Sequence, residues 1–391
     1  MFERFYNNAA RKGFHFPGRL IAGDGALSDA IKASAAPHVL IIDAALCERE
    51  LPVPRDTLRI PVTREPLRDD ALAAAEKAAA VSPQTIIALG GGSTIDVAKA
   101  VVMQLRHGTL DARDAPRSFK APLLVAASSL PGAGSETSRF FILSDPATGH
   151  KISQRSFDVV PDVTVLDPHL LEGASATRLL AGAFDAFMHL WETFICRHER
   201  SPATDMLALH HMPLLMRAAE TLSRNVRPDQ SVLMELLYAS AYGGIAISNV
   251  RTGLVHTLGE SLAAQIALPH PLTLLAFFSA GLSSYRDAIG DRLALLLPHL
   301  NAQLPERAPW SLDALIAHWQ EVLTRTGLYE RVRHALSRGI DIDTLLIAAA
   351  RDSVLTKENP VPVTPQSLTA IVRSSLASFA APVSRAPFTR E

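Results

Sequence analysis

Residues Thr85–Ala100 read TIIALGGGSTIDVAKA, and this stretch decides the class of fold. The aliphatic run Thr85–Gly90 predicts a buried strand, and Ser93–Leu105 predicts a helix that follows it at once. The glycines between them let the backbone approach a ligand closely and adopt positive φ angles. We expect Ser93 to cap the helix, with Asp96 completing a capping-box-like pattern. Because a helix start offers free N–H groups and a positive dipole end, the stretch favours a nucleotide pyrophosphate; a ligand-free tight turn is the alternative.

Strands and helices alternate on both sides of this stretch, up to about residue 168. The other expected strands are His38–Asp43, Thr57–Val62 and Leu123–Ala127, with short runs near Phe140–Leu143 and Val163–Asp167, and Asp69–Val81 is an alanine-rich helix. This alternation predicts parallel βαβ units. Beyond Pro168 the pattern becomes helical, with expected helices over Ala176–Cys196, Ala203–Ser223 and Gln230–Asn249. We therefore predict an α/β dinucleotide-binding domain over residues 1–168 and an all-helical domain over residues 169–391.

Composition narrows the class of protein. The chain has 391 residues, of which 48% are hydrophobic and 20% charged, as in an ordinary soluble globular protein. Its formal net charge of −1 gives no reason to expect nucleic acid or an acidic membrane as a partner. The two cysteines, Cys47 and Cys196, argue against a disulfide framework or a cysteine-based metal site. The N-terminus lacks a signal-peptide pattern and no stretch predicts a membrane span, so we expect a cytoplasmic protein.

Asp43 ends the strand HVLIID. An acidic side chain at that place can accept hydrogen bonds from an adenosine ribose and repel a 2′-phosphate, which favours NAD(H) over NADP(H). A plain aspartate that caps the following turn explains the residue equally well.

A first candidate metal-ligand pair lies in AGAFDAFMHLWETF. Asp185 and His189 are four residues apart, so they share one face of the predicted helix. Their neighbours are apolar, and burying an aspartate and a histidine there requires a partner. A metal is one such partner, and a hydrogen-bonded Asp–His pair is the other.

A second pair lies in GLVHTLGESLAAQIALPHPL. His256 and His270 are fourteen residues apart, and prolines on both sides place His270 at a turn or a helix start. One carboxylate and three imidazoles would suit one divalent ion, Fe²⁺ or Zn²⁺, with a position left for a substrate oxygen. The spacing does not itself bring the two pairs together.

Taken in order, these segments resemble the iron-containing (group III) alcohol dehydrogenase family, which is related to glycerol dehydrogenase and dehydroquinate synthase. The segments are GGGSTIDVAKA, LPGAGSETSRFFILSD, HKI, VLDP, GAFDAFMHLWETF, SPATDMLAL, GLVH, LPH and KENPVPVT. The resemblance implies a dehydroquinate synthase-like architecture, a homodimer and a cofactor in the cleft between domains. It implies four metal ligands: Asp185, His189, His256 and His270. It implies cofactor contacts from Gly91, Gly92, Ser93, Asp96, Ser129, Ser135 and Lys151.

The sequence departs from the family pattern at three places. Leu130 and Ala133 stand where the family's second loop often has threonines. Glu260 stands four residues after His256, where the family commonly carries another histidine close to the nicotinamide. Arg251, five residues before His256, stands where the family often has a small residue, and it could bind an anionic group of the substrate. A surface arginine is the alternative.

The resemblance predicts hydride transfer between a nicotinamide and a small alcohol or carbonyl substrate that could carry an anionic group, with Glu260 as the proton relay. Glu260 could instead be a fifth metal ligand or an ion-pair partner of Arg251. A maleylacetate-reductase-like enzyme without metal is one rival function, disfavoured by the full ligand set. A dehydroquinate-synthase-like cyclase is disfavoured by the spacings. A non-catalytic metal- or nucleotide-binding member is the rival from another class.

Overall fold

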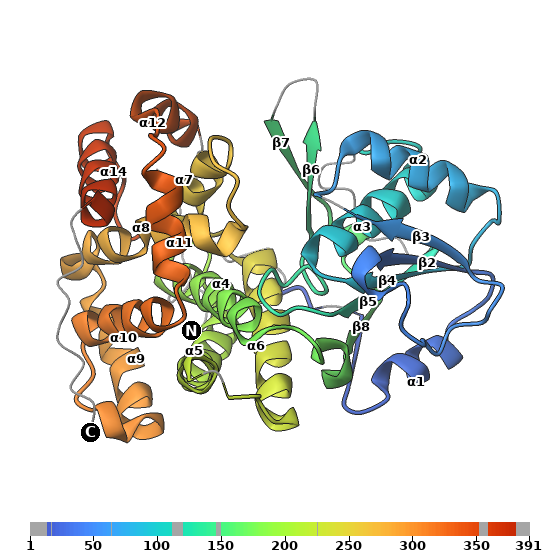
Figure 1. Cartoon of the computed structure of the whole chain (residues 1–391), viewed down its shortest axis with the longest axis horizontal. Coiled ribbons are helices and arrows are strands. Elements are labelled where there is room, and N and C mark those ends of the chain that lie inside the picture. Colours follow the sequence, from blue (N-terminus) through green and yellow to red (C-terminus); the bar gives the residue numbers. More distant parts are fainter. Residues whose placement is uncertain are drawn as a thin grey trace, which may run out of the picture.

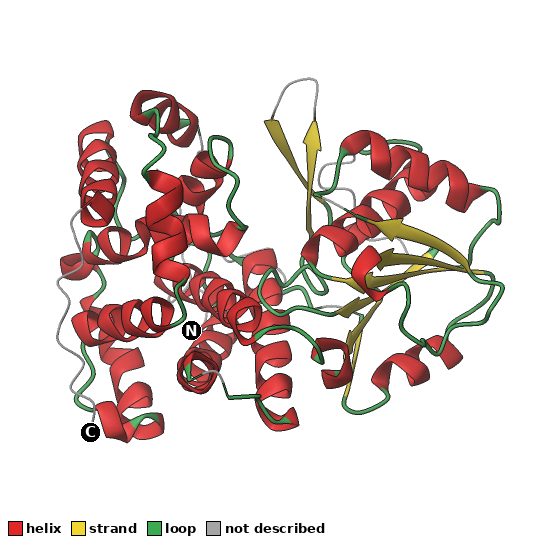
Figure 2. Cartoon of the chain, viewed as in Figure 1, coloured by secondary structure: helices red, strands yellow, loops and turns green. Residues whose placement is uncertain are grey.

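The computed structural model of the chain describes residues 14–16, 18–63, 65–111, 120–145, 150–224, 226–351 and 359–380. It has an α/β part built around one sheet and a part made of helices, which pack against each other side by side (Figure 1 and Figure 2). Strands occupy the chain up to β8 (Val163–Leu166), and the described residues after it form helices and connecting loops. This arrangement confirms the predicted fold class, and the division at residue 168 stays our proposal.

The main sheet has six parallel strands in the order β1-β8-β5-β4-β2-β3. Besides β8, its strands are β1 (Arg19–Ala22), β2 (His38–Asp43), β3 (Leu58–Val62), β4 (Thr85–Gly90) and β5 (Leu123–Ser128). A separate antiparallel hairpin is formed by β6 (Phe140–Asp145) and β7 (His150–Arg155). β3 lies on one side of β2, whereas β4, the next strand along the chain, lies on the other side, so the direction of strand order reverses here. Ligands of parallel α/β sheets bind at the carboxyl ends of the strands at such a reversal, which here puts the glycine-rich turn and Asp43 at the expected crevice.

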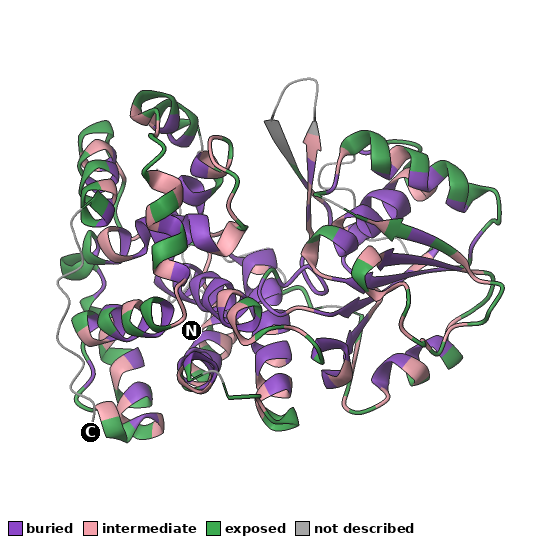
Figure 3. Ribbon diagram, in the orientation of Figure 1, coloured by how far each residue is buried: buried purple, intermediate pink, exposed green. Residues whose placement is uncertain are grey.

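Successive side chains of a strand belong in turn to two hydrophobic cores, one on each face of the sheet. In β2, Val39 and Ile41 pack with α2 (Arg68–Ala79) and α3 (Gly92–His107) on one face of the sheet. Leu40 and Ile42 face the other side, where α1 (Ala26–Lys32) and the helices of the second part share one continuous core. Because side chains of a strand alternate between faces, this pattern needs aliphatic residues at consecutive positions, as Val39–Ile42 provides. The central strands β2, β4 and β5 are correspondingly buried, whereas the outer surface of α2 is exposed (Figure 3).

The helical part is centred on α4 (Ala176–Ile195), α5 (Pro202–Ser223) and α6 (Gln230–Asn249), which pack on one another. The remaining helices are α7 (Leu254–Ala263), α8 (His270–Ser283), α9 (Gly290–Gln303), α10 (Leu312–Arg325), α11 (Leu328–Leu336), α12 (Ile342–Ala350) and α14 (Pro365–Ala380). Short 3-10 turns lie at η3 (Ala44–Leu46), η4 (Phe157–Val159), η5 (Pro168–Leu171), η6 (Arg286–Ala288) and η7 (Pro305–Arg307).

Within the described residues, α6 is the one helix whose length and apolar composition would suffice to cross a membrane. However, 67% of its most apolar window is buried inside the protein. A helix in the core of a folded protein has the same composition, and α6 packs against both α4 and α5 in this way.

Candidate metal centre and cofactor cleft

Three helices bring the four predicted metal ligands to one point. Asp185 and His189 lie one turn apart on α4, His256 lies in the first turn of α7, and His270 is the first residue of α8. The Nε2 atoms of His189, His256 and His270 lie 3.9, 3.8 and 3.7 Å from Oδ1 of Asp185. The proline before His270 ends the preceding loop, so the histidine projects from a helix start as predicted.

The ligand atoms of Asp185, His256 and His270 all lie within 4.8 Å of one another. His189 is not part of that tightest group, although its ring stacks on His256 with centroids 4.6 Å apart. A cation at the centre of this cluster would be close to the ligand atoms of Asp185, His256 and His270. Nε2 of His189 would be the fourth ligand atom, next to these three.

Two buried atoms at the centre have no hydrogen-bond partner among the residues that the structure describes. Oδ1 of Asp185 and Nε2 of His256 are both unsatisfied, while their side chains are almost fully buried. An unpaired buried polar atom is costly, and one cation placed between them would satisfy both. The donor set of one carboxylate oxygen and three imidazole nitrogens fits a divalent transition-metal ion.

Hydrogen bonds on the far side of two rings fix their tautomers. His256 donates from Nδ1 to Oε2 of Glu192 at 2.6 Å, and His189 donates from Nδ1 to the carbonyl oxygen of Gly132 at 3.2 Å. In the neutral form of each ring, with the proton on Nδ1, the lone pair lies on Nε2, the atom that faces Asp185. This is the usual second hydrogen bond of a metal-binding histidine.

The electrostatics of the cluster favour a charged carboxylate. Burial alone would raise the pKa of the Asp185 carboxyl, but the imidazoles of His189, His270 and His256 outweigh burial and hold this pKa below its usual range. Burial lowers the pKa of His189 to about 4. Burial also opposes a proton on His256, yet the carboxylates of Glu192 and Asp185 raise its pKa to about 10. Without a metal, the raised pKa of His256 means that its ring carries a second proton on Nε2, beside the Asp185 carboxylate, and a bound cation would take the place of that proton.

A cleft runs from this cluster to the α/β part. Its lining includes all four of the predicted ligands, together with Asp96 and Ser135 from the other side and Arg251 and Glu260 from the α6–α7 region. Arg251 is half-buried, whereas Glu260 is exposed at the edge of the cleft. The prediction that Glu260 lies beside the metal ligands is consistent with its place in this lining.

The glycine-rich turn differs from its predicted geometry. Helix α3 begins at Gly92, its N-cap is Gly91, and no side chain caps it, so the prediction that Ser93 is the cap is wrong. None of the three glycines has a positive φ. The turn instead needs small residues for close packing, because a Cβ on Gly90 would lie 2.5 Å from Oγ1 of Thr94. Gly91 and Gly92 are half-buried and Ser93 is exposed, so the helix start remains accessible.

Asp96 does not complete a capping box. Its carboxylate accepts hydrogen bonds from the Ser135 hydroxyl and from the backbone N–H of Ile142 at 3.0 Å. Beside it, the buried ammonium of Lys99 donates to the carbonyl oxygens of Ser138 and Phe140 at 2.8 and 2.7 Å. Burial raises the pKa of Asp96 and lowers that of Lys99 to about 8. Asp96 and Ser135 thus lie together in the cleft through a contact that the spacing did not reveal, and their contact with a cofactor stays a prediction.

The remaining predicted cofactor residues lie at different distances from this cleft. Asp43 ends β2, next to β4 in the sheet, and accepts a hydrogen bond from the N–H of Ala45 at 3.0 Å, as in the capping alternative. Ser129 is buried directly after β5, and its N–H donates to the carbonyl oxygen of Gly90 at 2.9 Å. Lys151 lies in β7, opposite Ser144, and its side chain lies outside the described residues.

Two site residues were given no role in the sequence analysis. Glu192 lies within the GAFDAFMHLWETF segment. It is the third ionisable residue of an apolar helix, and this is the signal that could have identified it as part of the site. Asn359 lies in the KENPVPVT segment and accepts a hydrogen bond from the N–H of Leu254 at 3.0 Å. Both act on the first turn of α7, a relationship that no sequence spacing encodes.

Comparison with known proteins agrees with this geometry. Residues 57–168 match the family described as iron-containing alcohol dehydrogenase, and residues 179–376 match the C-terminal part of the Fe-containing alcohol dehydrogenase family. The chain is 30% identical over 194 residues to an NADPH-dependent butanol dehydrogenase from Clostridium saccharobutylicum, which covers 48% of this chain and 49% of that protein. It is 30% identical over 225 residues to a sulfoacetaldehyde reductase from Bilophila wadsworthia, which covers 56% and 57%. The matches thus span about half the length of these curated relatives.

Among solved structures, a sulfoacetaldehyde reductase from Bifidobacterium kashiwanohense in complex with NAD⁺ superposes with a TM-score of 0.78. The identity is 18%, and the match covers 94% of this chain and 99% of that one, which shows a shared fold. The chain belongs to the iron-containing alcohol dehydrogenase family, because the two family matches together cover most of it in the expected order. The predicted resemblance is therefore confirmed.

Proposed function

We propose that this protein is a metal-dependent alcohol dehydrogenase, or aldehyde or ketone reductase, that transfers a hydride between a nicotinamide cofactor and a small substrate. The observation that carries the proposal is the convergence of Asp185, His189, His256 and His270 at a cleft reaching Asp96 and Ser135. The names of the relatives support this proposal, since the three proteins compared above are one dehydrogenase and two reductases.

Asp185, His189, His256 and His270 would hold one divalent ion. The family description names iron, which favours Fe²⁺ over Zn²⁺ for a ligand set that accepts both. When bound, such an ion polarises the oxygen of an alcohol or carbonyl group. The buried Asp185 carboxylate would offset its charge, and the fixed Nδ1 protons of His189 and His256 keep both Nε2 atoms directed at it.

The cofactor would lie across the carboxyl ends of β4 and β2. The accessible N-terminus of α3, with Gly91, Gly92 and Ser93, is suited to a pyrophosphate. Asp96, Ser129, Ser135 and Lys151 would complete the site. Asp43 favours NAD(H), in line with the NAD⁺ complex of one structural neighbour, while one relative is named as NADPH-dependent.

Glu260 would move the proton of the substrate. It lies one helical turn after His256, lines the cleft and is exposed, which supports a path for the proton between the ligand cluster and solvent. Arg251 lines the same cleft and would bind an anionic group of the substrate. Two relatives are named as reductases of sulfoacetaldehyde, a substrate with a sulfonate, which supports an anionic substrate here.

We further propose that the enzyme acts as a homodimer on a small molecule, with no nucleic acid or membrane partner. Sedimentation equilibrium of the full chain tests the dimer.

The test of the function is a metal assay combined with an activity assay. The purified chain should contain iron or bind added Fe²⁺ or Zn²⁺, and oxidise NADH with a panel of aldehydes and keto acids. His256→Ala and His270→Ala should lose both bound metal and turnover. An active metal-free variant would favour the maleylacetate-reductase-like alternative. A wild-type chain that binds metal and NADH but reduces nothing would favour the non-catalytic alternative.

A further inference from the structure

The first turn of α7 is capped by residues from other parts of the chain. The N-cap residue, Gly253, has no side chain to accept a hydrogen bond. A helix start leaves several backbone N–H groups without partners inside the helix. Here the N–H groups of Gly253 and Val255 donate to the two carboxylate oxygens of Glu192 at 2.9 and 2.7 Å. The N–H of Leu254, between them, donates to Oδ1 of Asn359 at 3.0 Å.

The same carboxylate also holds the metal-facing histidine. Oε2 of Glu192 accepts both the Gly253 N–H and the Nδ1 proton of His256. Glu192 and Asn359 are each only 4% exposed, so water does not compete for these bonds. The position of the α7 backbone and the tautomer of His256 are therefore set together by one buried group.

The packing leaves no room for another cap. A Cβ added to Gly253 would lie 2.9 Å from Oδ1 of Asn359 and 3.1 Å from Oε1 of Glu192. A serine or aspartate cap, the usual solution, would thus collide with the groups that replace it. Glycine at this position and the two distant acceptors form one device, which we call the α7 clamp.

We propose that Glu192 and Asn359, the two acceptors of the α7 clamp, are positioning residues that make the metal affinity of the site depend on the segment just before α14. The proposal rests on the proposed function, because it concerns the divalent ion assigned there to Asp185 and the three histidines. Asn359 belongs to the C-terminal part of the chain. Its effect passes through the Leu254 N–H to the turn that carries His256.

This arrangement uses both carboxylate oxygens of Glu192 as acceptors. Three donors meet its two oxygens, so both oxygens must be acceptors. In Glu192→Gln, an amide NH₂ replaces one oxygen and must face either the Val255 N–H or the Gly253 N–H and the His256 ring. In the first orientation a backbone N–H meets another donor, and in the second the His256 proton is driven to Nε2, the atom that faces Asp185. Either outcome disturbs the site without changing the size of the side chain.

The test compares Glu192→Gln and Asn359→Ala with Asn301→Ala in the full-length protein. Asn301 is a matched control, because its Oδ1 accepts the N–H of Trp310 at 2.9 Å, a bond of the same kind away from the cleft. Each variant is stripped with a chelator and titrated with Co²⁺. We expect Kd for Co²⁺ to rise about 10- to 100-fold in Glu192→Gln and Asn359→Ala, the usual effect of losing such a supporting contact, and to stay at the wild-type value in Asn301→Ala. Equal Kd values in all four proteins would overturn the proposal.

Hydrogen exchange of the wild-type chain tests the clamp even if a variant fails to fold. Added Co²⁺ should slow exchange in peptides that contain Leu254 and Val255, while the peptide that contains Trp310 should not respond. Unchanged exchange around Leu254 on metal binding would contradict the clamp. Failure of the proposed function looks different, because a wild-type chain that binds no Co²⁺ overturns both proposals, whereas a metal-binding wild type with unaffected variants overturns only this one.

Discussion

The carbonyl oxygen of Gly132 lies 3.2 Å from Nδ1 of His189 and so connects the loop after β5 to the metal cluster. Gly132 also donates its N–H to the Ser240 hydroxyl at 2.9 Å, which ties the same loop to α6. Its φ of +131° lies in a region that residues with side chains rarely adopt. The α/β part thus reaches the proposed metal site through Gly132, a residue whose backbone conformation favours glycine.

Gly132→Ala should therefore weaken both the fold and the metal site. An added Cβ would lie 2.9 Å from Cα of Gly182 on α4, in addition to the strain from the positive φ. We expect the free energy of unfolding to fall by about 1–3 kcal/mol and the metal content to decrease. Chemical denaturation and metal analysis measure the two effects.

Gly23→Ala is the control for this prediction. Gly23 has a similar φ of +121°, but no atom lies within 4 Å of an added Cβ, so its substitution introduces strain without a clash. We expect a smaller loss of stability and full metal content. Equal losses in the two variants would show that contact with α4 does not matter.

Glu260→Gln tests the proton relay. A carboxyl group that moves the substrate proton contributes about 10²-fold or more to turnover, and an amide cannot replace it. We expect kcat to fall by about that factor and one limb of the pH–rate profile to disappear, while bound metal stays unchanged. Glu306→Gln, at an exposed position of η7, is the control and should behave as wild type. Unaltered turnover in Glu260→Gln would exclude the relay, and loss of metal would indicate that Glu260 is a ligand.

Arg251→Met tests the anionic substrate. A guanidinium that pairs with a carboxylate or sulfonate contributes about 1.5–3 kcal/mol, so kcat/KM should fall about 10- to 100-fold for an anionic aldehyde. It should change little for a neutral aldehyde of matched length. Arg251→Lys should give an intermediate loss because an ammonium lacks the planar, two-pronged geometry. A uniform loss with both substrates would assign Arg251 to the structure of the site and not to recognition.

The spacing of apolar residues predicted the main helices and strands, because each of these elements buries one or both of its faces. His38–Asp43 and Thr85–Gly90 have the predicted bounds, and Gln230–Asn249 is the predicted helix. The strand Arg19–Ala22 was missed because four residues carry no measurable alternation. The cap at Ser93 was wrong because Gly92 already adopts the helical conformation, an arrangement set by the packing of the turn against Ala133.

The candidate site was predictable only in part. Asp185 and His189 share a helix face, which follows from spacing alone. Bringing His256 and His270 to them depends on how α7 and α8 pack, and only the family resemblance indicated that. The partners Gly132, Glu192 and Asn359 act through backbone groups of residues distant in the sequence. Such bonds leave no local pattern, because almost any sequence offers the same N–H and carbonyl groups.

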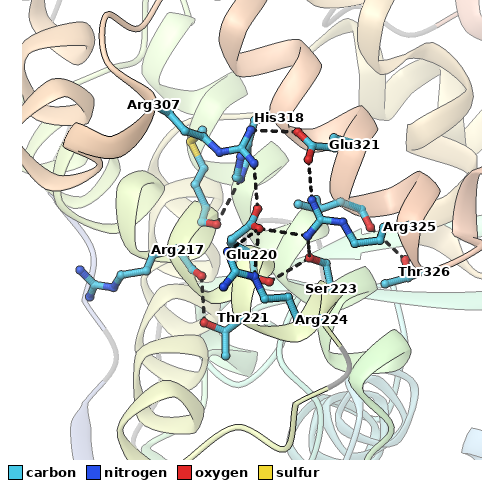
Figure 4. Close-up of polar contacts among 12 residues, drawn as sticks. Arg217, Glu220, Thr221, Ser223, Arg224, Arg307, His318, Glu321, Arg325 and Thr326 are labelled. Carbon is cyan, nitrogen blue, oxygen red and sulfur yellow. Dashed lines mark hydrogen bonds and ion pairs between the residues drawn. The ribbon is translucent and has the colours of Figure 1, made fainter. Parts of the chain in front are cut away.

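A charge network outside the cleft makes a prediction about acid stability. Glu220 of α5 accepts hydrogen bonds from Arg224, Arg325 and Arg307 at 3.1, 3.0 and 3.2 Å, and Arg307 and Arg325 also pair with Glu321 (Figure 4). Burial alone would raise the pKa of Glu220, but the hydrogen bonds from Arg325 and Arg224 outweigh it and lower this pKa. The network therefore links α5 to η7 and α10 through a carboxylate that the folded state keeps ionised.

Glu220→Gln should destabilise the protein at neutral pH but not in acid. A carboxyl whose pKa is lowered by folding contributes stability above its unfolded pKa, and this contribution is lost as the pH falls through the lower pKa of the folded state. We expect a loss of about 1–2 kcal/mol at pH 7, in keeping with a partly exposed network, and a difference from wild type that shrinks below about pH 4. Thermal unfolding from pH 3 to pH 8 measures it, with Glu76→Gln on the exposed side of α2 as the control. A loss of the same size at every pH would mean that the side chain matters for packing and that its charge does not.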